Sequence, residues 1–183
     1  MLLIVGSSVL DKDEWISVLK ERVRSVILEN RTPLVGICFG HQIIASCLDD
    51  TLVERNQSGW EVGFTEMSLS SYGSKLFSAE KVFFHSFHKD HVVRLPLGFH
   101  LVGGNSHTAI QIMTNVESGG MVLSIQAHPE FTQEYIHELV RLRSSQNVIS
   151  ASFVAHVESC SHKSTDSLLF ASKILLLFQQ KRL

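Results

Sequence analysis

The fold of this chain is decided by the stretch LVGICFGHQ, residues 34–42. Residues 34–37 are a short apolar run typical of a buried strand, and the apolar residues after position 42 recur at the spacing of a helix. Between the two lies Gly36-Ile37-Cys38-Phe39-Gly40, the G-x-nucleophile-x-G pattern of a sharp turn from strand to helix. The stretch therefore predicts a strand, a strained turn that exposes Cys38, and a helix.

Strands and helices also alternate on both sides of this stretch. Residues 1–5 form a short apolar run typical of a strand, and acidic residues at positions 11, 13 and 14 precede a helix whose apolar residues recur every three or four positions. Nearer the C-terminus, a strand over residues 121–125 is followed by a helix over about residues 133–143. This alternation predicts an α/β fold with a parallel, doubly wound sheet.

The middle of the chain is richer in strands. Short runs that favour strands cover residues 62–67, 81–84, 100–102 and 108–112, with turn residues between them and few helices. A polar stretch over residues 159–164 precedes a final helix that carries apolar residues from Leu168 to Phe178. Because no repeat, low-complexity tract or linker divides the sequence, we expect a single domain over residues 1–183.

The composition excludes several classes of function. The 183 residues are 44% hydrophobic and 19% charged, as in an ordinary globular domain. A formal net charge of -2 is too balanced for the basic surface that nucleic-acid binding requires. No apolar run approaches the ~20 residues that span a bilayer, and no basic segment precedes the first apolar run. We expect a cytoplasmic protein that binds neither nucleic acid nor membrane.

Cys38 is the strongest candidate for a chemical role. The helix that follows it directs its positive end at the sulfur, which favours the thiolate. The alternative is a buried structural cysteine. Cys47 and Cys160 lack this setting and are predicted to be packing residues. Three cysteines without a CxxC pair predict neither a disulfide framework nor a thiolate zinc site, and they fit a reduced cytosol.

A base for this nucleophile is offered by His128-Pro129-Glu130, directly after an apolar strand. Proline at 129 biases His128 toward an extended conformation, and the two-residue period of extended chain then places His128 and Glu130 on one face. The alternative is an ordinary turn after a strand. The pattern predicts that Glu130 orients the imidazole of His128.

Two motifs together, GICFGHQ at residues 36–42 and QAHPE at residues 126–130, resemble the class I glutamine amidotransferase family. Further similar segments are Gly6-Ser7-Ser8, which is similar to the family's oxyanion loop, GWEVG at 59–63, SFHKD at 86–90, and Leu95-Pro96. The chain looks most similar to the stand-alone fungal and plant members, some of which are γ-glutamyl peptidases.

The resemblance implies a flavodoxin-like doubly wound sheet and cysteine-dependent hydrolysis of glutamine or a γ-glutamyl amide or peptide through a γ-glutamyl thioester. It implies no cofactor, no metal and a small-molecule substrate. The residues that it implies are the catalytic Cys38, His128 and Glu130, the oxyanion-hole residues Gly6, Ser7 and Phe39, and the substrate-binding residues Gln42 and His88.

The sequence departs from the family's pattern in ways that leave alternatives open. Family members begin with a β-α-β unit ahead of the oxyanion loop, so we expect an N-terminally shortened fold whose open sheet edge takes a protein partner or a second copy. Lys89 stands where the family has glycine and is placed to crowd the substrate pocket. The rival hypothesis is a catalytically impaired scaffold or regulatory protein. Transfer of free ammonia would require a separate partner.

A second cluster, His85, His88 and His91, recurs at three-residue steps and has the donor type that zinc prefers. The run that precedes it favours a strand, on which steps of three alternate between faces. The pattern therefore predicts no metal site.

Overall fold

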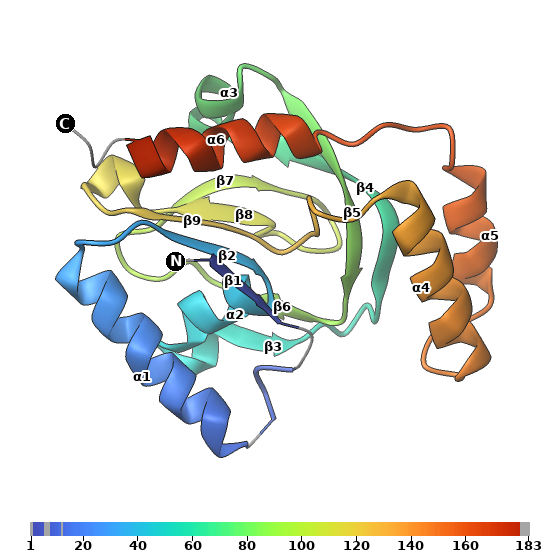
Figure 1. The fold of residues 1–183 in the computed structure, drawn as a ribbon, viewed down its shortest axis with the longest axis horizontal. Helices are drawn as coiled ribbons and strands as arrows, with labels where there is room; N and C mark the ends of the chain where they lie inside the picture. The colour runs from blue at the N-terminus through green and yellow to red at the C-terminus, as the bar shows by residue number, and fades with distance from the viewer. Residues whose placement is uncertain (1, 6–7, 12, 180–183) are drawn as a thin grey trace.

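A seven-stranded mixed sheet forms the centre of the computed structural model, which describes residues 2–5, 8–11 and 13–179 (Figure 1). Three strands at one side of the sheet run parallel to one another, and the others continue it in antiparallel pairs. In spatial order the strands are β1 (Leu2–Val5), β2 (Leu34–Cys38), β9 (Val122–Ile125), β8 (Ile112–Thr114), β7 (His100–Gly104), β4 (Glu61–Leu69) and β5 (Lys81–His88).

The α/β fold expected from the sequence is confirmed, but the sheet is not parallel throughout. β1, β2 and β9 pair in parallel, as expected of a doubly wound arrangement. Beyond β9 the pairings are antiparallel. The connections between β7, β8 and β9 are short and contain no α-helix, whereas a parallel crossover needs a dozen or more residues, usually a helix. These short connections explain why β7, β8 and β9 are antiparallel neighbours.

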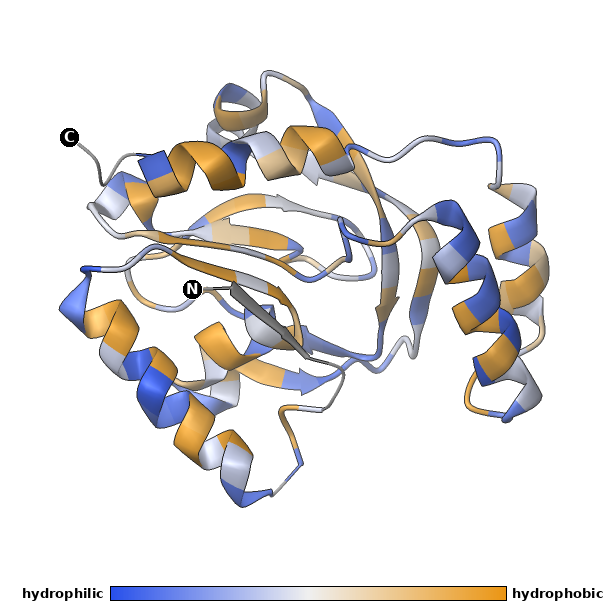
Figure 2. Ribbon diagram, viewed as in Figure 1, coloured by the Kyte–Doolittle hydropathy of each residue, from blue (hydrophilic) through white to orange (hydrophobic). Residues whose placement is uncertain are grey.

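Helices cover both faces of the sheet (Figures 1 and 2). One face packs against α1 (Glu14–Glu29) and α2 (Phe39–Ser46), and the other against α6 (Ser167–Gln179) and α3 (Ser71–Phe77). Along β2, Leu34 belongs to the first core, whereas Val35 and Ile37 belong to the second. Burial on both faces explains why β2 reads as a continuous apolar run.

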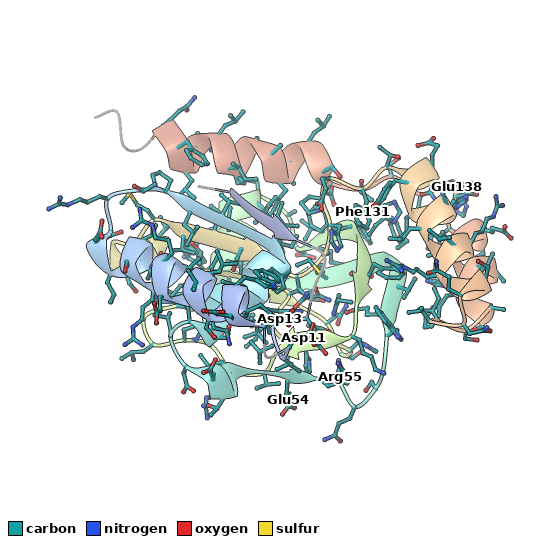
Figure 3. The ribbon with its side chains drawn as sticks, turned by 60° about the horizontal axis from the view of Figure 1, so that its bottom comes forward. Asp11, Asp13, Glu54, Arg55, Phe131 and Glu138 are labelled. Atoms are coloured by element: carbon teal, nitrogen blue, oxygen red, sulfur yellow. The ribbon has the colours of Figure 1, made fainter. Side chains whose placement is uncertain are left out.

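A third core holds two helices beside the antiparallel part of the sheet. In it α4 (Gln133–Ser145) and α5 (Ser152–Ser159) pack on β4 through Val62, Ile136 and Val157. Figure 3 shows Phe131 beside the sheet, just before α4, and Glu138 on the outward side of that helix. A separate two-stranded sheet pairs β3 (Val53–Arg55) with β6 (Asp90–Val92), and the 3-10 turns are Asp50–Leu52 and Val116–Ser118.

Several elements differ from the sequence predictions, among them the short strands β3 and β6, which were not expected. Helices α3 and α5 were not expected, because serine-rich segments resemble turns; the hydroxyl of Ser70 instead caps α3 by accepting a bond from the Gly73 N–H at 3.0 Å. The strand expected over residues 108–112 begins only at Ile112. The side chains of Thr108 and Gln111 donate to Glu61, and these bonds accompany a loop in place of the expected strand.

At the edge of the main sheet, as far as the described residues extend, lies β1. Apolar side chains are exposed on the helices, among them Trp15 and Val18 on α1 and Leu168 and Leu175 on α6. Association at this edge stays a prediction. Within the described ranges, no helix has both the length and the apolar character needed to cross a membrane.

Candidate active site

Cys38 lies at the junction of β2 and α2, with φ 50° and ψ -103°. This is a strained conformation for a residue with a side chain, as the sequence predicted. A Cβ atom on Gly36 would lie 2.5 Å from Cδ1 of Ile44 and 2.6 Å from the carbonyl oxygen of Gly40. Glycine at 36 therefore allows the helix to approach the strand, and this approach presents Cys38 to a pocket.

His128 and Glu130 meet directly: Nδ1 of His128 lies 2.8 Å from Oε1 of Glu130. The expected extended chain between them is wrong, because residues 128–131 form a turn in which the Phe131 N–H donates to the His128 carbonyl at 3.2 Å. The His128 N–H donates to the carbonyl of His85 at 2.8 Å and ties the turn to β5. The two side chains are thus brought together by a turn, which is the alternative that the sequence also allows for this segment.

The electrostatics of the site centre on the contact between Cys38 and His128. Burial alone would lower the pKa of His128. The negative charge on the Cys38 sulfur, a hydrogen bond with that sulfur and the Glu130 carboxylate together outweigh burial and raise the pKa of His128 to about 9. At neutral pH the imidazole of His128 is therefore mostly protonated, and it lies beside the sulfur that would act as the nucleophile.

Phe131 stacks on the imidazole of His128, a contact that the sequence did not predict. Its ring stacks on that of His128, with centroids 3.9 Å apart and an interplanar angle of 10°. It lies one residue beyond the QAHPE segment, and nothing in the local pattern distinguishes it from a core residue.

Gln126 contacts the nucleophile as well. Its Nε2 donates to Sγ of Cys38 over 3.7 Å, and its Oε1 accepts from Nε2 of Gln42 at 3.2 Å. The Gln126 side chain is fully buried. Its place in QAHPE was visible in the sequence, but the contact with a residue 88 positions away was not.

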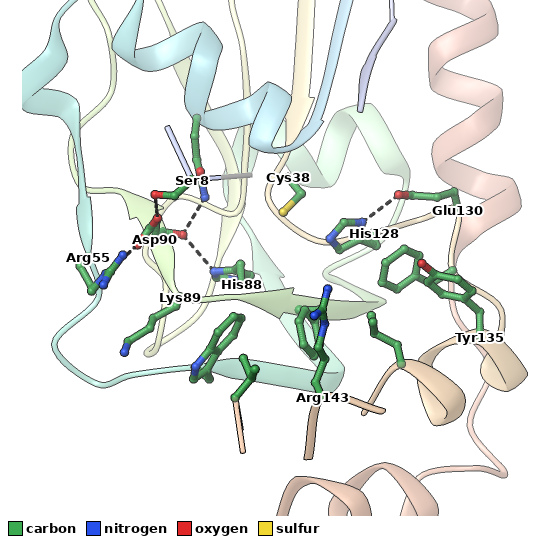
Figure 4. A pocket seen from close by; sticks show the side chains of 16 residues that line it. Ser8, Cys38, Arg55, His88, Lys89, Asp90, His128, Glu130, Tyr135 and Arg143 are labelled. Carbon is green, nitrogen blue, oxygen red and sulfur yellow. Dashed lines mark hydrogen bonds and ion pairs between the residues drawn. The ribbon is translucent and has the colours of Figure 1, made fainter. Parts of the chain in front are cut away.

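Asp90 is the point where several site residues converge (Figure 4). Its carbonyl oxygen accepts from Nε2 of Gln42 at 2.8 Å and lies 3.2 Å from Nδ1 of His88. Its carboxylate accepts from Oγ of Ser8 at 2.5 Å and from Nε of Arg55 at 3.2 Å. Gln42 and His88 line the pocket while holding Asp90, and their binding of substrate stays a prediction.

The oxyanion hole is described only in part. Phe39 is the first residue of α2, so its N–H is one of the donors that a helix leaves without an intrahelical partner. Gly6 and Ser7 lie outside the described residues. Ser8, the next residue of that loop, is tied to Asp90.

Glu61 carries a buried polar network behind the site. Its carboxylate accepts from Asn105 at 2.7 Å, Thr108 at 2.9 Å and Gln111 at 2.8 Å, and Nε2 of His88 lies 3.0 Å away. Burial would raise the pKa of Glu61, but the contacts with His88, Asn105 and Thr108 outweigh it and lower the pKa. A buried carboxylate with four partners fixes the position of His88 at the end of β5.

These residues border a cavity of about 690 Å³. Cys38 and His128 lie at its wall, and side chains of α4 and of the segment after it extend the wall away from them (Figure 4). The lining residues are Ser8, Cys38, Gln42, Arg55, Trp60, Phe87, His88, Lys89, Asp90, His128, Glu130, Phe131, Tyr135, Leu139, Arg143 and Val148.

The remaining histidines and cysteines have separate surroundings. His85 packs on Phe64, His88 contacts Glu61, and His91 lies 3.3 Å from the Asn56 amide, so the three imidazoles do not converge. Over residues 2–5, 8–11 and 13–179, no group of three His, Cys, Asp or Glu is arranged to hold a metal ion. Cys47 and Cys160 are buried, and burial raises the pKa of Cys47 to about 12.

Comparison with known proteins agrees with this geometry. The family model described as glutamine amidotransferase class-I matches residues 8–142. A Schizosaccharomyces pombe protein named provisionally as glutamine amidotransferase-like is 31% identical over 81% of this chain and 60% of its own length. A Saccharomyces cerevisiae protein named provisionally as a glutamine amidotransferase is 30% identical over 92% of this chain and 66% of its own length.

This chain thus spans about two thirds or less of the length of these two relatives. A solved glutamine amidotransferase from Thermotoga maritima has the same fold, with a TM-score of 0.66 and 21% identity over 99% of this chain and 76% of the other. The match over residues 8–142 covers the Cys38 turn and the His128-Pro129-Glu130 segment. On this evidence the chain belongs to the class I glutamine amidotransferase family.

Proposed function

We propose that this chain hydrolyses the side-chain amide of glutamine or of another γ-glutamyl compound, including a γ-glutamyl peptide, and that Cys38 is the nucleophile. The observation that carries the proposal is the alignment of Cys38, His128 and Glu130 at one wall of a cavity. A nucleophile, a base in contact with it and a carboxylate that orients the base are the parts that acyl transfer requires.

In the first half of the reaction the Cys38 sulfur attacks the amide carbon, and a carbon–sulfur bond forms. His128 gives its proton to the departing amine, the carbon–nitrogen bond breaks, and a γ-glutamyl thioester remains. The Phe39 N–H, with donors from the loop at Gly6 and Ser7, stabilises the oxyanion of the tetrahedral intermediate, a contribution of about 3 kcal/mol per donor.

In the second half a water molecule attacks the thioester. Neutral His128 accepts a proton from that water, and the sulfur leaves as the thiolate, which releases the γ-carboxylate. Glu130 holds Nδ1 of His128, so Nε2 is the atom that exchanges protons with sulfur, amine and water. Hydrolysis needs no second protein, whereas delivery of ammonia to an acceptor would require one.

A catalytically impaired scaffold is the rival proposal. It is favoured by the charged Lys89 side chain in the cavity wall and opposed by the direct contact of His128 with both Cys38 and Glu130. A scaffold would not depend on a strained backbone at Cys38, because such strain lowers stability by roughly 1–3 kcal/mol without benefit to binding.

The deciding experiment measures glutamate release from glutamine and from a γ-glutamyl dipeptide. We expect release by the wild-type chain, none by Cys38→Ala, and wild-type release by Cys160→Ala, which removes a buried thiol away from the cavity. Release that is undiminished in Cys38→Ala would contradict the mechanism, and no release by the wild-type chain would favour the scaffold.

A further inference from the structure

We infer that the cavity recognises a γ-glutamyl compound whose leaving amine carries an apolar side chain and a free carboxylate, in preference to glutamine. In this inference Lys89 and Arg143 bind the carboxylates, and a wall made of Trp60, Phe87, Leu139 and Val148 holds the apolar side chain. The inference rests on the proposed γ-glutamyl chemistry.

The cavity is larger than a glutamine molecule requires. A volume of about 690 Å³ lies in the range of roughly 300–1,000 Å³ that suits a ligand larger than one amino acid. The cavity is continued by a shallower hollow that shares Trp60, Lys89 and Val148 with it and extends to Ile149 and Phe153. A glutamine bound with its amide at Cys38 would leave the part beyond the departing ammonia empty.

The apolar wall made of Trp60, Phe87, Leu139 and Val148 also favours such a ligand. The rings of Trp60 and Phe87 pack together with centroids 5.1 Å apart, and Leu139 is half-buried beside them in the third core. Val148 is 44% exposed. Burial of such surface by a ligand contributes about 25 cal/mol per Å². Ammonia has no apolar surface to bury against this wall, whereas an amine with an apolar side chain has.

The charged side chains of the cavity favour a ligand with more than one carboxylate. Besides His128, three cationic side chains line the cavity, Arg55, Lys89 and Arg143, against two carboxylates, Asp90 and Glu130. Both carboxylates are engaged, Asp90 with Arg55 at 3.2 Å and Glu130 with His128 at 2.8 Å. Among the residues that the structure describes, no ion pair joins Lys89 or Arg143 to a carboxylate.

The two remaining cations lie at different positions along the cavity (Figure 4). Lys89 is half-buried at the end of β5, and Arg143, whose Nη1 donates to Oε1 of Gln146 at 3.0 Å, extends from α4. Glutamine has one carboxylate, but a γ-glutamyl amino acid has two. Two separate cations that pair with no carboxylate of the described residues therefore match the γ-glutamyl amino acid better.

The test measures binding to the Cys38→Ala protein, which cannot form the thioester, by titration calorimetry. The ligands are γ-glutamyl-leucine, its C-terminal amide and glutamine. We expect γ-glutamyl-leucine to bind about tenfold more tightly than its amide and than glutamine, as one charge-assisted contact provides. Lys89→Gln or Arg143→Gln should remove the preference for the acid over its amide. Trp60→Ala should weaken the binding of γ-glutamyl-leucine more than the binding of glutamine.

Arg141→Gln is the matched control, because it removes the same charge from α4 at a position paired with Glu158 outside the cavity. It should leave all three affinities unchanged. Equal binding of the acid and its amide, or tighter binding of glutamine, overturns the inference, as does a preference that survives both cation substitutions. Hydrolysis is measured separately. If Cys38→Ala prefers γ-glutamyl-leucine as expected but the wild type releases no glutamate, the proposed function is refuted and the inferred recognition is not.

Discussion

The side-chain amide of Gln126 donates to the sulfur of Cys38, with Nε2 and Sγ 3.7 Å apart. A donor at this distance stabilises a negatively charged sulfur and also fixes its direction. Gln126 is in turn held by Gln42, so the position of the nucleophile depends on a chain of buried amides as well as on His128.

Replacing Gln126 should therefore slow the reaction of Cys38 with an alkylating reagent. Gln126→Met keeps a similar shape without the donor, and loss of a hydrogen bond to a charged group costs roughly 1.5–3 kcal/mol, or about tenfold to a hundredfold in rate. Alkylation rates mapped by mass spectrometry at pH 7.5 test this. Gln57→Met, at an exposed position, is the control, and equal rates in the two variants would refute the role of Gln126.

Cys38 should be the only one of the three cysteines to react quickly. It is the one that lines the cavity, whereas Cys47 and Cys160 are buried, and burial raises the pKa of Cys47 to about 12. Limited labelling of the folded protein with iodoacetamide, followed by peptide mapping, should find the label at Cys38 first. Earlier labelling of Cys160 would speak against an activated turn.

The pKa of His128 should fall when the sulfur is removed. Its value of about 9 depends on the Cys38 charge and hydrogen bond, which oppose the effect of burial. In Cys38→Ala the imidazole should be largely neutral at pH 8, where it is mostly protonated in the wild type. Histidine NMR titrations of the two proteins test this, and an unchanged midpoint near pH 9 would show that Cys38 does not act on His128.

Glu130→Gln should be milder than Cys38→Ala. The amide keeps the shape of the carboxylate but loses its charge, so His128 is oriented less well, whereas the nucleophile is intact. We expect glutamate release to be reduced yet measurable in Glu130→Gln and absent in Cys38→Ala. A wild-type rate in Glu130→Gln would contradict the orienting role of Glu130. Glu138→Gln, on the outward side of α4, is the control.

The sequence predicted those parts of the site whose cause is local. The turn at Cys38 follows from glycines within a few residues of it, and the parallel strands β1, β2 and β9 follow from apolar runs next to helices. The pairing of Glu130 with His128 was also expected from their spacing, although the backbone between them was predicted wrongly.

The parts that escaped prediction depend on distant residues. Glu61 is bonded to side chains 44 to 50 positions away, and these bonds accompany the loop found at residues 108–111 where a strand was expected. Lys89 looked like an obstruction in the sequence, and only the structure shows that it lies in a cavity wall where no carboxylate of residues 2–5, 8–11 or 13–179 pairs with it. Such features arise from topology, which periodicity along the chain does not report.

The last prediction concerns stability in acid. His41 is fully buried, with Nδ1 2.9 Å from Oγ of Ser124 and Nε2 3.2 Å from the carbonyl of Ile110. Burial lowers its pKa to about 3, against the effect of the Ile110 bond and together with repulsion from His88. Well above pH 6.5 the group is neutral in both the folded and the unfolded chain, so it contributes no dependence on pH there.

Below pH 6.5 the unfolded chain binds a proton at His41 that the folded chain does not. The free energy of unfolding should therefore fall as the pH falls, by up to about 1.4 kcal/mol per pH unit from this group, until folded His41 is protonated near pH 3. His41→Gln retains a donor and an acceptor without the titration. Urea unfolding at pH 7.0, 6.0 and 5.0 should give a shallower fall for the variant, since the other titrating groups are common to both proteins. Parallel curves would show that His41 is protonated equally in the folded and unfolded states, and the variant's lower stability at pH 7.0 would then report only the loss of its two buried contacts.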